Sequence, residues 1–306
     1  MNLIALQGAV ELGLIYAVMA LGVFISFRTL NMPDLTVDGS FVLGAAVSAI
    51  LASLGYPVPG LILGFIAGAA AGMITALLHT KLGIQPLLSG ILVMLSLYSV
   101  NLRVMGNKSN IPLLNKATVF SIFKDTPLAD YSGLILGAIL LAILLVLLYL
   151  LLKTRFGLVL RATGDNEHMV RASGVNTDRE KLIGLALANG LVGLSGGMIA
   201  QYQRFADTGM GVGMVIIGLA SVIIGEVIFG TQTLLRRLIA VVLGAILYRA
   251  VIAIALDLGM PATDLKLISA VIVTLALAIP FIGKKYSKLR RRLAVFKEKE
   301  EGNDDA

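Results

Sequence analysis

The chain of 306 residues contains no cysteine, and its only histidines are His79 and His168. Without cysteine, neither a disulfide framework nor a thiolate-bound metal site can form. Two histidines far apart in the sequence are also too few for a His-rich metal centre, so no metal site is expected. Apolar segments with paired aspartates, or with a histidine-containing dyad, are missing as well. We therefore do not expect an intramembrane hydrolase.

Charged residues are scarce too, at 14% of the chain, whereas 58% is hydrophobic and the mean hydropathy is +0.92. Residues 133–152, "GLILGAILLAILLVLLYLLL", form a run of twenty residues without a charge. At about 1.5 Å per residue, this run can cross a hydrocarbon core roughly 30 Å thick. Because such runs recur, the composition predicts an all-α polytopic membrane protein with about eight or nine transmembrane helices. The predicted spans are 6–27, 38–54, 58–78, 85–104, 132–152, 182–203, 211–230, 235–256 and 264–282.

Lysine and arginine predict the orientation, because basic residues in short loops stay on the cytoplasmic side. A cytoplasmic C-terminus places most basic loop residues inside and leaves Lys108, Lys116 and Lys124 outside. We therefore expect a multi-pass protein of the cell membrane, with a transmembrane domain over residues 1–283. A cytoplasmic tail over 284–306 begins basic and ends acidic. The N-terminus lacks a basic region and a cleavage site, so we expect a retained helix and not a signal peptide.

A break is predicted near residues 28–40, where Pro33, two aspartates and Gly39 stand between apolar runs. Non-helical backbone at membrane depth is tolerated where it is buried in protein or lines a wet cavity. On this interpretation the segment is re-entrant, one crossing disappears and the N-terminus lies inside. The alternative is an ordinary turn in which Asp34 or Asp38 caps the next helix, with nine crossings and the N-terminus outside.

Polar residues near this break are candidates for lining a translocation pathway for a small polar or zwitterionic solute. An aspartate could there meet an ammonium group. The candidates are Asp34, Thr36, Asp38 and Ser40 from the break, Asn189, Ser195, Gln201 and Gln203 from the sixth span, and Ser96 and Asn101 from the fourth.

The internal loop 153–181 is conspicuously polar and lies between two spans on the predicted cytoplasmic side. Within "RATGDNEHMVRASGVNTDREK", we expect a short helix over 166–173, capped by Asp165 and ended by Gly174. Glu167 and Arg171 are spaced to pair on one face of that helix. Met169, Ala172 and Ser173 lie on another face of the helix. This face is small and mostly apolar, so we expect it to dock into a partner.

The residues of this loop resemble the cytoplasmic coupling loop of ABC importer permeases. The closest similarity is to the family that moves branched-chain amino acids, ribose-type sugars and nucleosides. The stretches "DLTVDGSFVLGA" and "ALANGLVGLSGGMIAQYQRFADTGMGVGMVIIGLASVIIG" are similar to two further blocks of that family and occur in the same order. The matching loop residues imply a set that couples to an ATPase: Arg161, Gly164, Asp165, Asn166, Glu167, Met169, Arg171, Gly174 and Asn176.

The resemblance implies a permease subunit that has no catalytic residues and no enzyme activity. It pairs with a second permease, often a copy of itself. Two cytoplasmic ATPases would bind ATP below it, so no cofactor is expected on this chain. A solute-binding protein would deliver an amino acid, with a hydrophobic or aromatic one favoured over a nucleoside or sugar. The outer segment 105–131 is then expected to be a partly ordered cap that contacts this binding protein. The lipid bilayer is a further expected partner, and no nucleic acid is expected. A stand-alone ion-coupled transporter remains the competing class.

The sequence "LSGGM" at 194–198 nearly spells the signature of an ABC ATPase, but the chain has no phosphate loop of the type Gly-x4-Gly-Lys-Ser/Thr. Gly193 and Gly197 instead form a Gly-x3-Gly pair, which allows close helix packing in lipid.

Three ionisable residues, Glu11, Glu226 and Arg249, fall within apolar spans, where structural pairing is the expected role. We expect Glu226 to meet Arg236 or Arg237. Arg249 is expected to extend outward or to meet Asp257.

Overall fold

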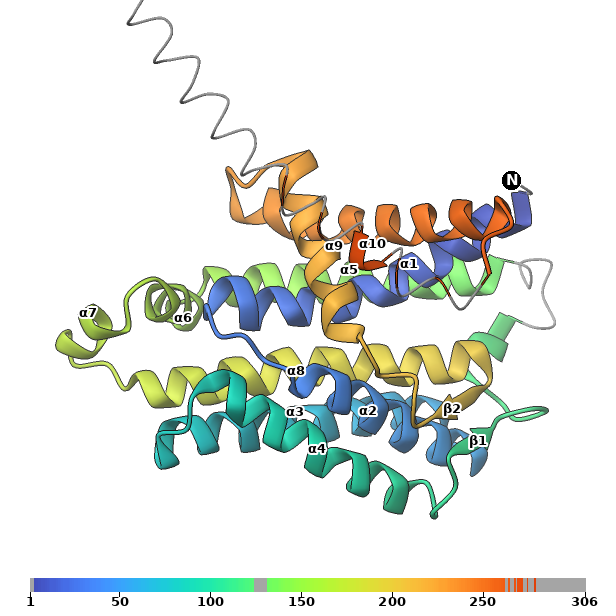
Figure 1. Cartoon of the computed structure of the whole chain (residues 1–306), viewed down its shortest axis with the longest axis horizontal. Coiled ribbons are helices and arrows are strands. Elements are labelled where there is room, and N and C mark those ends of the chain that lie inside the picture. Colours follow the sequence, from blue (N-terminus) through green and yellow to red (C-terminus); the bar gives the residue numbers. More distant parts are fainter. Residues whose placement is uncertain are drawn as a thin grey trace, which may run out of the picture.

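The computed structural model describes residues 3–123 and 131–261, together with residues 264, 267, 269–271, 274 and 278. This part of the chain is mostly helical (Figure 1). Seven of its helices are long and apolar enough to cross a membrane, and an eighth apolar helix, Met214–Phe229, is shorter. The prediction of an all-α polytopic membrane protein is confirmed. The elements are α1 (Leu3–Val23), η1 (Phe24–Thr29), α2 (Thr36–Ser53), α3 (Pro57–Leu82), α4 (Pro86–Val104), β1 (Asn110–Pro112), η2 (Val119–Phe123), α5 (Ser132–Lys153), α6 (Arg155–Asp165), α7 (Glu167–Ala172), α8 (Thr177–Gln203), β2 (Phe205–Asp207), α9 (Met214–Phe229) and α10 (Leu234–Asp257).

Each predicted span up to residue 256 corresponds to one of these helices, with ends that differ by a few residues. The agreement follows from composition, since a long apolar run in lipid must satisfy its backbone hydrogen bonds internally and so forms a helix. The ninth predicted span, 264–282, falls mostly outside the described residues, and the tail 284–306 lies wholly outside them.

The predicted break between the first two spans is present but shorter than residues 28–40. Helix α1 continues through the π-helical turn η1 to Thr29, and α2 begins at Thr36. The irregular residues between them are buried, with Leu30 4%, Met32 5% and Asp34 5% exposed. Helices α1 and α2 then run in opposite directions (Figure 1). Both helices are long and apolar enough to cross a membrane.

Helices α2, α3 and α8 pack so closely that backbone meets backbone at glycines. A Cβ atom on Gly193 would lie 2.6 Å from the carbonyl oxygen of Gly64, and one on Gly197 would lie 3.0 Å from Ser48 Cβ. Gly44 faces the Gly193 carbonyl, and Gly68 faces the Asn189 carbonyl, closely enough that neither position has room for a side chain. The predicted role of Gly193 and Gly197 in helix packing is confirmed. Such small residues replace the hydrophobic effect, which does not bring helices together in lipid.

The two ends of the helical bundle differ. Helices α6 and α7 form one end, whereas the N-terminus and the β1–β2 ribbon lie at the other (Figure 1). The ribbon is antiparallel and pairs Asn110 with Asp207 and Pro112 with Phe205. Beyond it, the backbone N–H of Val119 in η2 donates to Gln201 Oε1 at 2.8 Å. The predicted outer segment is thus ordered over its first part, while residues 124–130 lie outside the described residues.

The ionisable residues within apolar helices take structural partners. Glu226 forms ion pairs with Arg28 of η1 and with Arg237, the second at 3.3 Å, so the predicted Glu226–Arg237 pair is confirmed. The Arg249 guanidinium lies 4.1 Å from the centre of the Tyr16 ring. Glu11 accepts hydrogen bonds from the Tyr202 hydroxyl at 2.6 Å and from Gln7 at 3.0 Å.

Candidate functional site

Three consecutive helices make up the polar end, and each begins at a residue that caps it. Thr154 accepts a hydrogen bond from Gly157 N at the start of α6, Asn166 accepts from Met169 N at the start of α7, and Asn176 accepts from Asp178 N at the start of α8. A side-chain oxygen at this position satisfies a backbone N–H that has no partner within its helix. The sharp turns of this loop are therefore stabilised locally.

The predicted cap at Asp165 is wrong, because Asp165 is the last residue of α6 and Asn166 is the cap of α7. Asn166 has an extended backbone (φ −155°, ψ 95°), as a capping residue requires. The predicted end of the helix is confirmed: α7 stops at Ala172, and Gly174 has φ +82°. At that angle a side chain would be strained, so glycine suits the position.

Helix α6 is not predicted by the sequence analysis, which treats this region as loop. It packs against the end of the first membrane helix, because Gly164 faces the Thr29 carbonyl without room for a Cβ atom. Arg161 lies on the same helix, half-buried, and its Nε donates to Gly157 O at 3.4 Å. The loop 153–181 thus contacts the chain directly before the break.

Glu167 connects α7 to the beginning of α8. Its Oε1 accepts hydrogen bonds from Arg171 at 2.9 Å and from the Thr177 hydroxyl at 3.2 Å. Its Oε2 accepts from Lys181 Nζ at 2.7 Å. The predicted Glu167–Arg171 pair is confirmed, and Arg171 also pairs with Asp178 at 3.0 Å. Helix α7 is therefore fixed to α8 by charge as well as by the short connection.

Burial alone would raise the pKa of the Glu167 carboxyl. The hydrogen bond and charge of Lys181, helped by Thr177 and Arg171, outweigh burial and hold that pKa below its ordinary value of 4.5. Glu167 is thus ionised at neutral pH.

Lys181 extends this network to a third element. Its ammonium group donates to His79 Nε2 at 3.2 Å, and His79 Nδ1 lies 2.8 Å from Ile84 O in the turn between α3 and α4. Because a carbonyl oxygen only accepts, this geometry assigns the proton of His79 to Nδ1. The charged contacts of α7 therefore reach α8 and the α3–α4 turn. His79 is not among the residues predicted to couple to an ATPase. A lone histidine at a helix end gives no sign of a partner 102 residues away.

One face of α7 is left exposed by these contacts. Met169 is 57% exposed, and Ala172 and Ser173 are exposed beside it. Val170 faces inward and is buried. The surface predicted to dock into a partner is accordingly accessible in this chain.

The predicted pathway residues are not brought together. Ser195 donates to Ile15 O at 2.9 Å, and Ser96 and Gln203 are exposed. The other seven separate into three places. Four of them form one buried cluster near the break, centred on the fully buried amide of Asn189. Its Nδ2 donates to Asp34 Oδ2 at 2.6 Å, and its Oδ1 accepts from the Ser40 hydroxyl at 2.8 Å. Thr36 belongs to the same cluster, because its N–H donates to Asp34 Oδ1 at 2.8 Å and its hydroxyl lies 2.7 Å from that of Thr75. This cluster joins α2 to α3 and α8.

Gln201 lies apart from the cluster, towards the β-ribbon end. Its Nε2 donates to Ser48 Oγ at 2.9 Å and to Pro57 O at 2.7 Å. Asp38 is separate again. Its carboxylate accepts backbone N–H groups of the α9 N-terminus, from Gly213 at 3.0 Å and Val215 at 2.9 Å.

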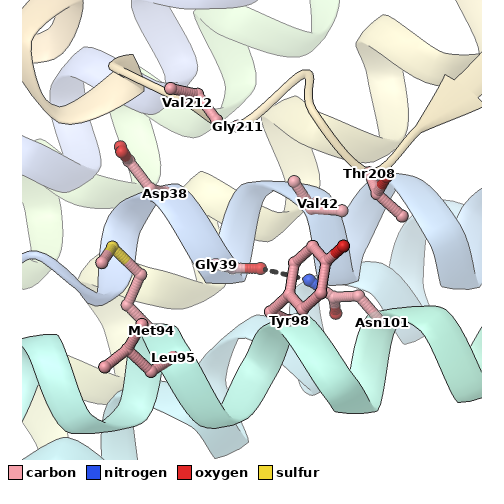
Figure 2. A pocket seen from close by; sticks show the side chains of 10 residues that line it. All are labelled: Asp38, Gly39, Val42, Met94, Leu95, Tyr98, Asn101, Thr208, Gly211 and Val212. Atoms are coloured by element: carbon pink, nitrogen blue, oxygen red, sulfur yellow. Dashed lines mark hydrogen bonds between the residues drawn. The ribbon is translucent and has the colours of Figure 1, made fainter. Parts of the chain in front are cut away.

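Asp38 also faces a pocket of about 260 Å³ between α2, α4 and the segment that joins β2 to α9 (Figure 2). Asp38 and Asn101 are among the predicted pathway residues. The other lining residues are not, because nothing in the sequence distinguishes them from their neighbours. The pocket is lined by Asp38, Gly39, Val42, Met94, Leu95, Tyr98, Asn101, Thr208, Gly211 and Val212.

Comparison with known proteins places this geometry in context. Residues 5–278 match the family described as the permease component of branched-chain amino acid transport systems. The chain is 40% identical over 281 residues to the tyrosine transport system permease protein of Clostridioides difficile, which covers 92% of both chains. No solved structure matches the chain.

Two more distant relatives extend the comparison. The probable branched-chain amino acid transport permease protein LivH of Methanocaldococcus jannaschii is 25% identical over 65% of this chain and 66% of its own length. The autoinducer 2 import system permease protein LsrC of Salmonella typhimurium is 26% identical over 91% of this chain and 78% of its own.

Proposed function

Because the chain belongs to the permease family of branched-chain amino acid transport systems, we propose that it is the transmembrane subunit of an ABC importer for an aromatic amino acid such as tyrosine. The similarity to a tyrosine transport permease over nearly the whole chain supports an aromatic amino acid. The match to LsrC, an autoinducer 2 permease, is weaker, at 26% identity, so it supports the solute of that system less.

The partners in this proposal are an ATPase pair, a second copy of the chain and a solute-binding protein. The ATPases bind ATP and contact the exposed face of α7. The binding protein delivers solute at the β-ribbon end, which is then extracytoplasmic, and the C-terminus is cytoplasmic. The chain itself carries no nucleotide and catalyses no reaction.

The observation that carries the proposal is the ionic network of Glu167. A helix that only covered the end of a bundle would not need charged contacts to two other elements, whereas a helix that transmits force does. When the ATPases close, α7 moves with them, and Glu167 passes this displacement to α8 through Lys181. Rigid-body movement of such helices is how transporters alternate access.

The displacement reaches the break from two sides. Asn189 lies two turns along α8 from Lys181 and is bonded to Asp34 and Ser40 of the break and α2. Helix α6 meanwhile contacts Thr29 at the other edge of the break. Movement of the loop is therefore converted into movement of the irregular segment 30–35 between α1 and α2.

Reconstitution tests the proposal. The chain is co-expressed with an ATPase encoded beside its gene, and the purified complex is placed in liposomes with the neighbouring binding protein. We expect co-purification, tyrosine-stimulated ATP hydrolysis and tyrosine uptake that requires ATP. An ATPase lacking its phosphate-loop lysine is the matched control and should abolish uptake. Uptake driven by an ion gradient without the ATPase, or stimulation by ribose or a nucleoside alone, would contradict the proposal.

A further inference from the structure

A pocket of about 400 Å³ lies between the start of α1 and the end of α10. The two helices run side by side in opposite directions, and these parts of both lie at the ribbon end of the molecule (Figure 1). The helices touch at Gly13, where a Cβ atom would lie 2.9 Å from Ile246 Cα. Nearer the ribbon end, small residues leave room between them: Ala5, Gly8, Ala9 and Ala253. The volume is within the roughly 300–1,000 Å³ of typical small-molecule sites.

Arg249 is the one cationic side chain among the described residues that line this pocket. Its guanidinium carbon lies 4.1 Å from the centre of the buried Tyr16 ring. No carboxylate of the described residues forms an ion pair with it. Asp257, the partner considered from the sequence, lies eight positions further along α10, a rise of about 12 Å. Within the described part of the chain, Arg249 thus has an aromatic contact but no counter-ion.

The charge of Arg249 is costly in these surroundings, because α10 is an apolar helix and the pocket wall beside the guanidinium is formed by Leu12, Ile252 and Ala253. A cation–π contact offsets only part of the cost of removing a cation from water. Ionisable residues within membrane helices are therefore candidates for binding or transport. An anion that entered this pocket would neutralise the guanidinium.

The nitrogen atoms of Arg249 differ in their access to the pocket. Nε is enclosed and has no hydrogen-bond partner among the described residues. The terminal atoms Nη1 and Nη2 also form no hydrogen bond with a described residue, but they are not enclosed, so they are open to the pocket. Two N–H groups at the end of a guanidinium match the two oxygens of a carboxylate. Arg249 can therefore bind a carboxylate end-on.

The depth of Arg249 favours a small solute over a phospholipid. Arg249 lies about 12 Å inside the end of α10, and its guanidinium reaches across to Tyr16 in the middle of α1. Lipid phosphates stay in the headgroup region outside the hydrocarbon core. A free carboxylate can enter from the ribbon end, and the apolar wall then suits the rest of a small molecule.

We propose that this pocket is a solute site of the permease, in which Nη1 and Nη2 of Arg249 bind the carboxylate of the imported amino acid and the apolar wall holds its side chain. The inference rests on the proposed import of an aromatic amino acid. It adds that the permease itself recognises the carboxylate, so that selectivity does not reside in the binding protein alone. Arg249 is outside the set of pathway residues predicted from the sequence.

Binding to the permease–ATPase complex without the binding protein tests this site. The probes are L-tyrosine, 3-(4-hydroxyphenyl)propanoate, which keeps the ring and carboxylate, and tyramine, which keeps the ring and ammonium group. Hydrogen bonds to a charged group change affinity by about tenfold or more. In a scintillation proximity assay we expect tyrosine and the propanoate to bind at least about tenfold more tightly than tyramine.

Substitutions separate recognition by Arg249 from folding. Arg249→Gln removes the charge and should bring the affinities for the propanoate and tyramine together. Arg103→Gln, at an exposed arginine in the last turn of α4, is the matched control and should leave all three affinities unchanged. Gly8→Leu fills the pocket from a position where nothing lies within 4 Å of a Cβ atom, so the fold should persist. We expect it to weaken tyrosine binding by about tenfold or more.

The wild-type comparison needs no substitution, and a complex that binds tyramine as tightly as the propanoate would overturn the site. So would an unchanged ratio of these two affinities in Arg249→Gln. Phospholipid that co-purifies with the wild type and is lost from Arg249→Gln, while tyrosine binding stays the same, would show a lipid site instead. If the complete system with its binding protein imports no amino acid, the proposed function itself is wrong. The two failures are therefore distinguishable.

Discussion

Glu167 is the residue on which the coupling loop depends most, because its two oxygens bind different neighbours. Lys181, whose side chain is only 10% exposed, forms an ion pair with this carboxylate. Replacing Glu167 by glutamine keeps a hydrogen-bond acceptor but removes the negative charge that pairs with this nearly buried ammonium group, at a cost of about 1–3 kcal/mol. The loss falls on the connection between α7 and α8 and not on the membrane helices.

We predict that Glu167→Gln lowers tyrosine-stimulated ATP hydrolysis in the reconstituted importer by about tenfold, as expected for the loss of about 1.4 kcal/mol of coupling. The variant should still enter the membrane and co-purify with the ATPase. Glu180→Gln removes the same charge one residue from Lys181, where no ion pair is formed in the described structure, and is the matched control. Equal effects of both substitutions would contradict the role of Glu167.

The pH dependence of this pair follows from the depressed pKa of Glu167. Its stabilising effect is complete above the ordinary carboxyl value of 4.5 and is lost as the pH falls through the lower value of the folded chain. Between about pH 6 and pH 8 the Glu167 carboxyl stays ionised, so its own titration should not change the activity ratio of wild type to Glu167→Gln.

At the residue scale, the sequence predicts partners that are close along a helix and misses those that are not. The pairing of Glu167 with Arg171 follows from a spacing of four residues. The contacts of Lys181 with His79 and of Asn189 with Asp34 depend on how the helices pack. That packing cannot be predicted from a single sequence. The cap was misplaced by one residue because Asp165 and Asn166 are both good capping residues, and the unpredicted α6 extends through Asp165.

The break and its buried cluster are built on helices α2, α3 and α8. Glycine residues allow these three helices to pack closely against one another. Gly68 of α3 lies against the backbone of α8 at the Asn189 carbonyl. A methyl group there would push α3 away from the same residue that bonds Asp34 and Ser40. The tight packing of these three helices therefore fixes the position of Asn189.

We predict that Gly68→Ala destabilises the protein by about 1–3 kcal/mol through overpacking. Gly8→Ala in α1 is the matched control, because nothing lies within 4 Å of a Cβ atom at Gly8. Thermal unfolding in detergent should show a lower midpoint for the first variant and an unchanged or slightly higher one for the second, since alanine favours helix. An unchanged midpoint for Gly68→Ala would show that the helices can separate without cost.

At the element scale, apolar length predicts the membrane helices well because lipid leaves the backbone no alternative. The short helix α6 was missed because its sequence, "RFGLVLRATGD", mixes charge with apolar residues and lies where a loop is expected. It packs against the end of η1 at Gly164. This tertiary contact cannot be predicted from the composition of the segment.

For the whole molecule, the polar end with α7 and the ribbon end with β1 and β2 must face opposite sides of the membrane (Figure 1). The bias of basic residues predicts that the α7 end is cytoplasmic. Because the chain has no cysteine, single substitutions can report this orientation without background. Ser173 and Lys108, both exposed, mark the two ends.

We predict that Lys108→Cys reacts with a membrane-impermeant maleimide in intact cells, whereas Ser173→Cys reacts only after the membrane is permeabilised. In bacteria with an outer membrane, the reagent must first reach the periplasm. Labelling of the two variants is read by mass shift on a gel, with the cysteine-free parent as the control. The reverse pattern would place α7 outside and would exclude an ATPase partner there.

Helix α8 carries both Lys181, which receives α7, and Asn189, which is bonded to the break. The two residues are eight positions apart, about 12 Å along one continuous helix. A helix of this kind neither stretches nor stores displacement between them. In the proposed mechanism we therefore expect the loop and the break to move together, without an intermediate in which one has shifted and the other has not. Spin labels on these two parts of α8 should keep a constant separation through every nucleotide state, even as both move relative to α10.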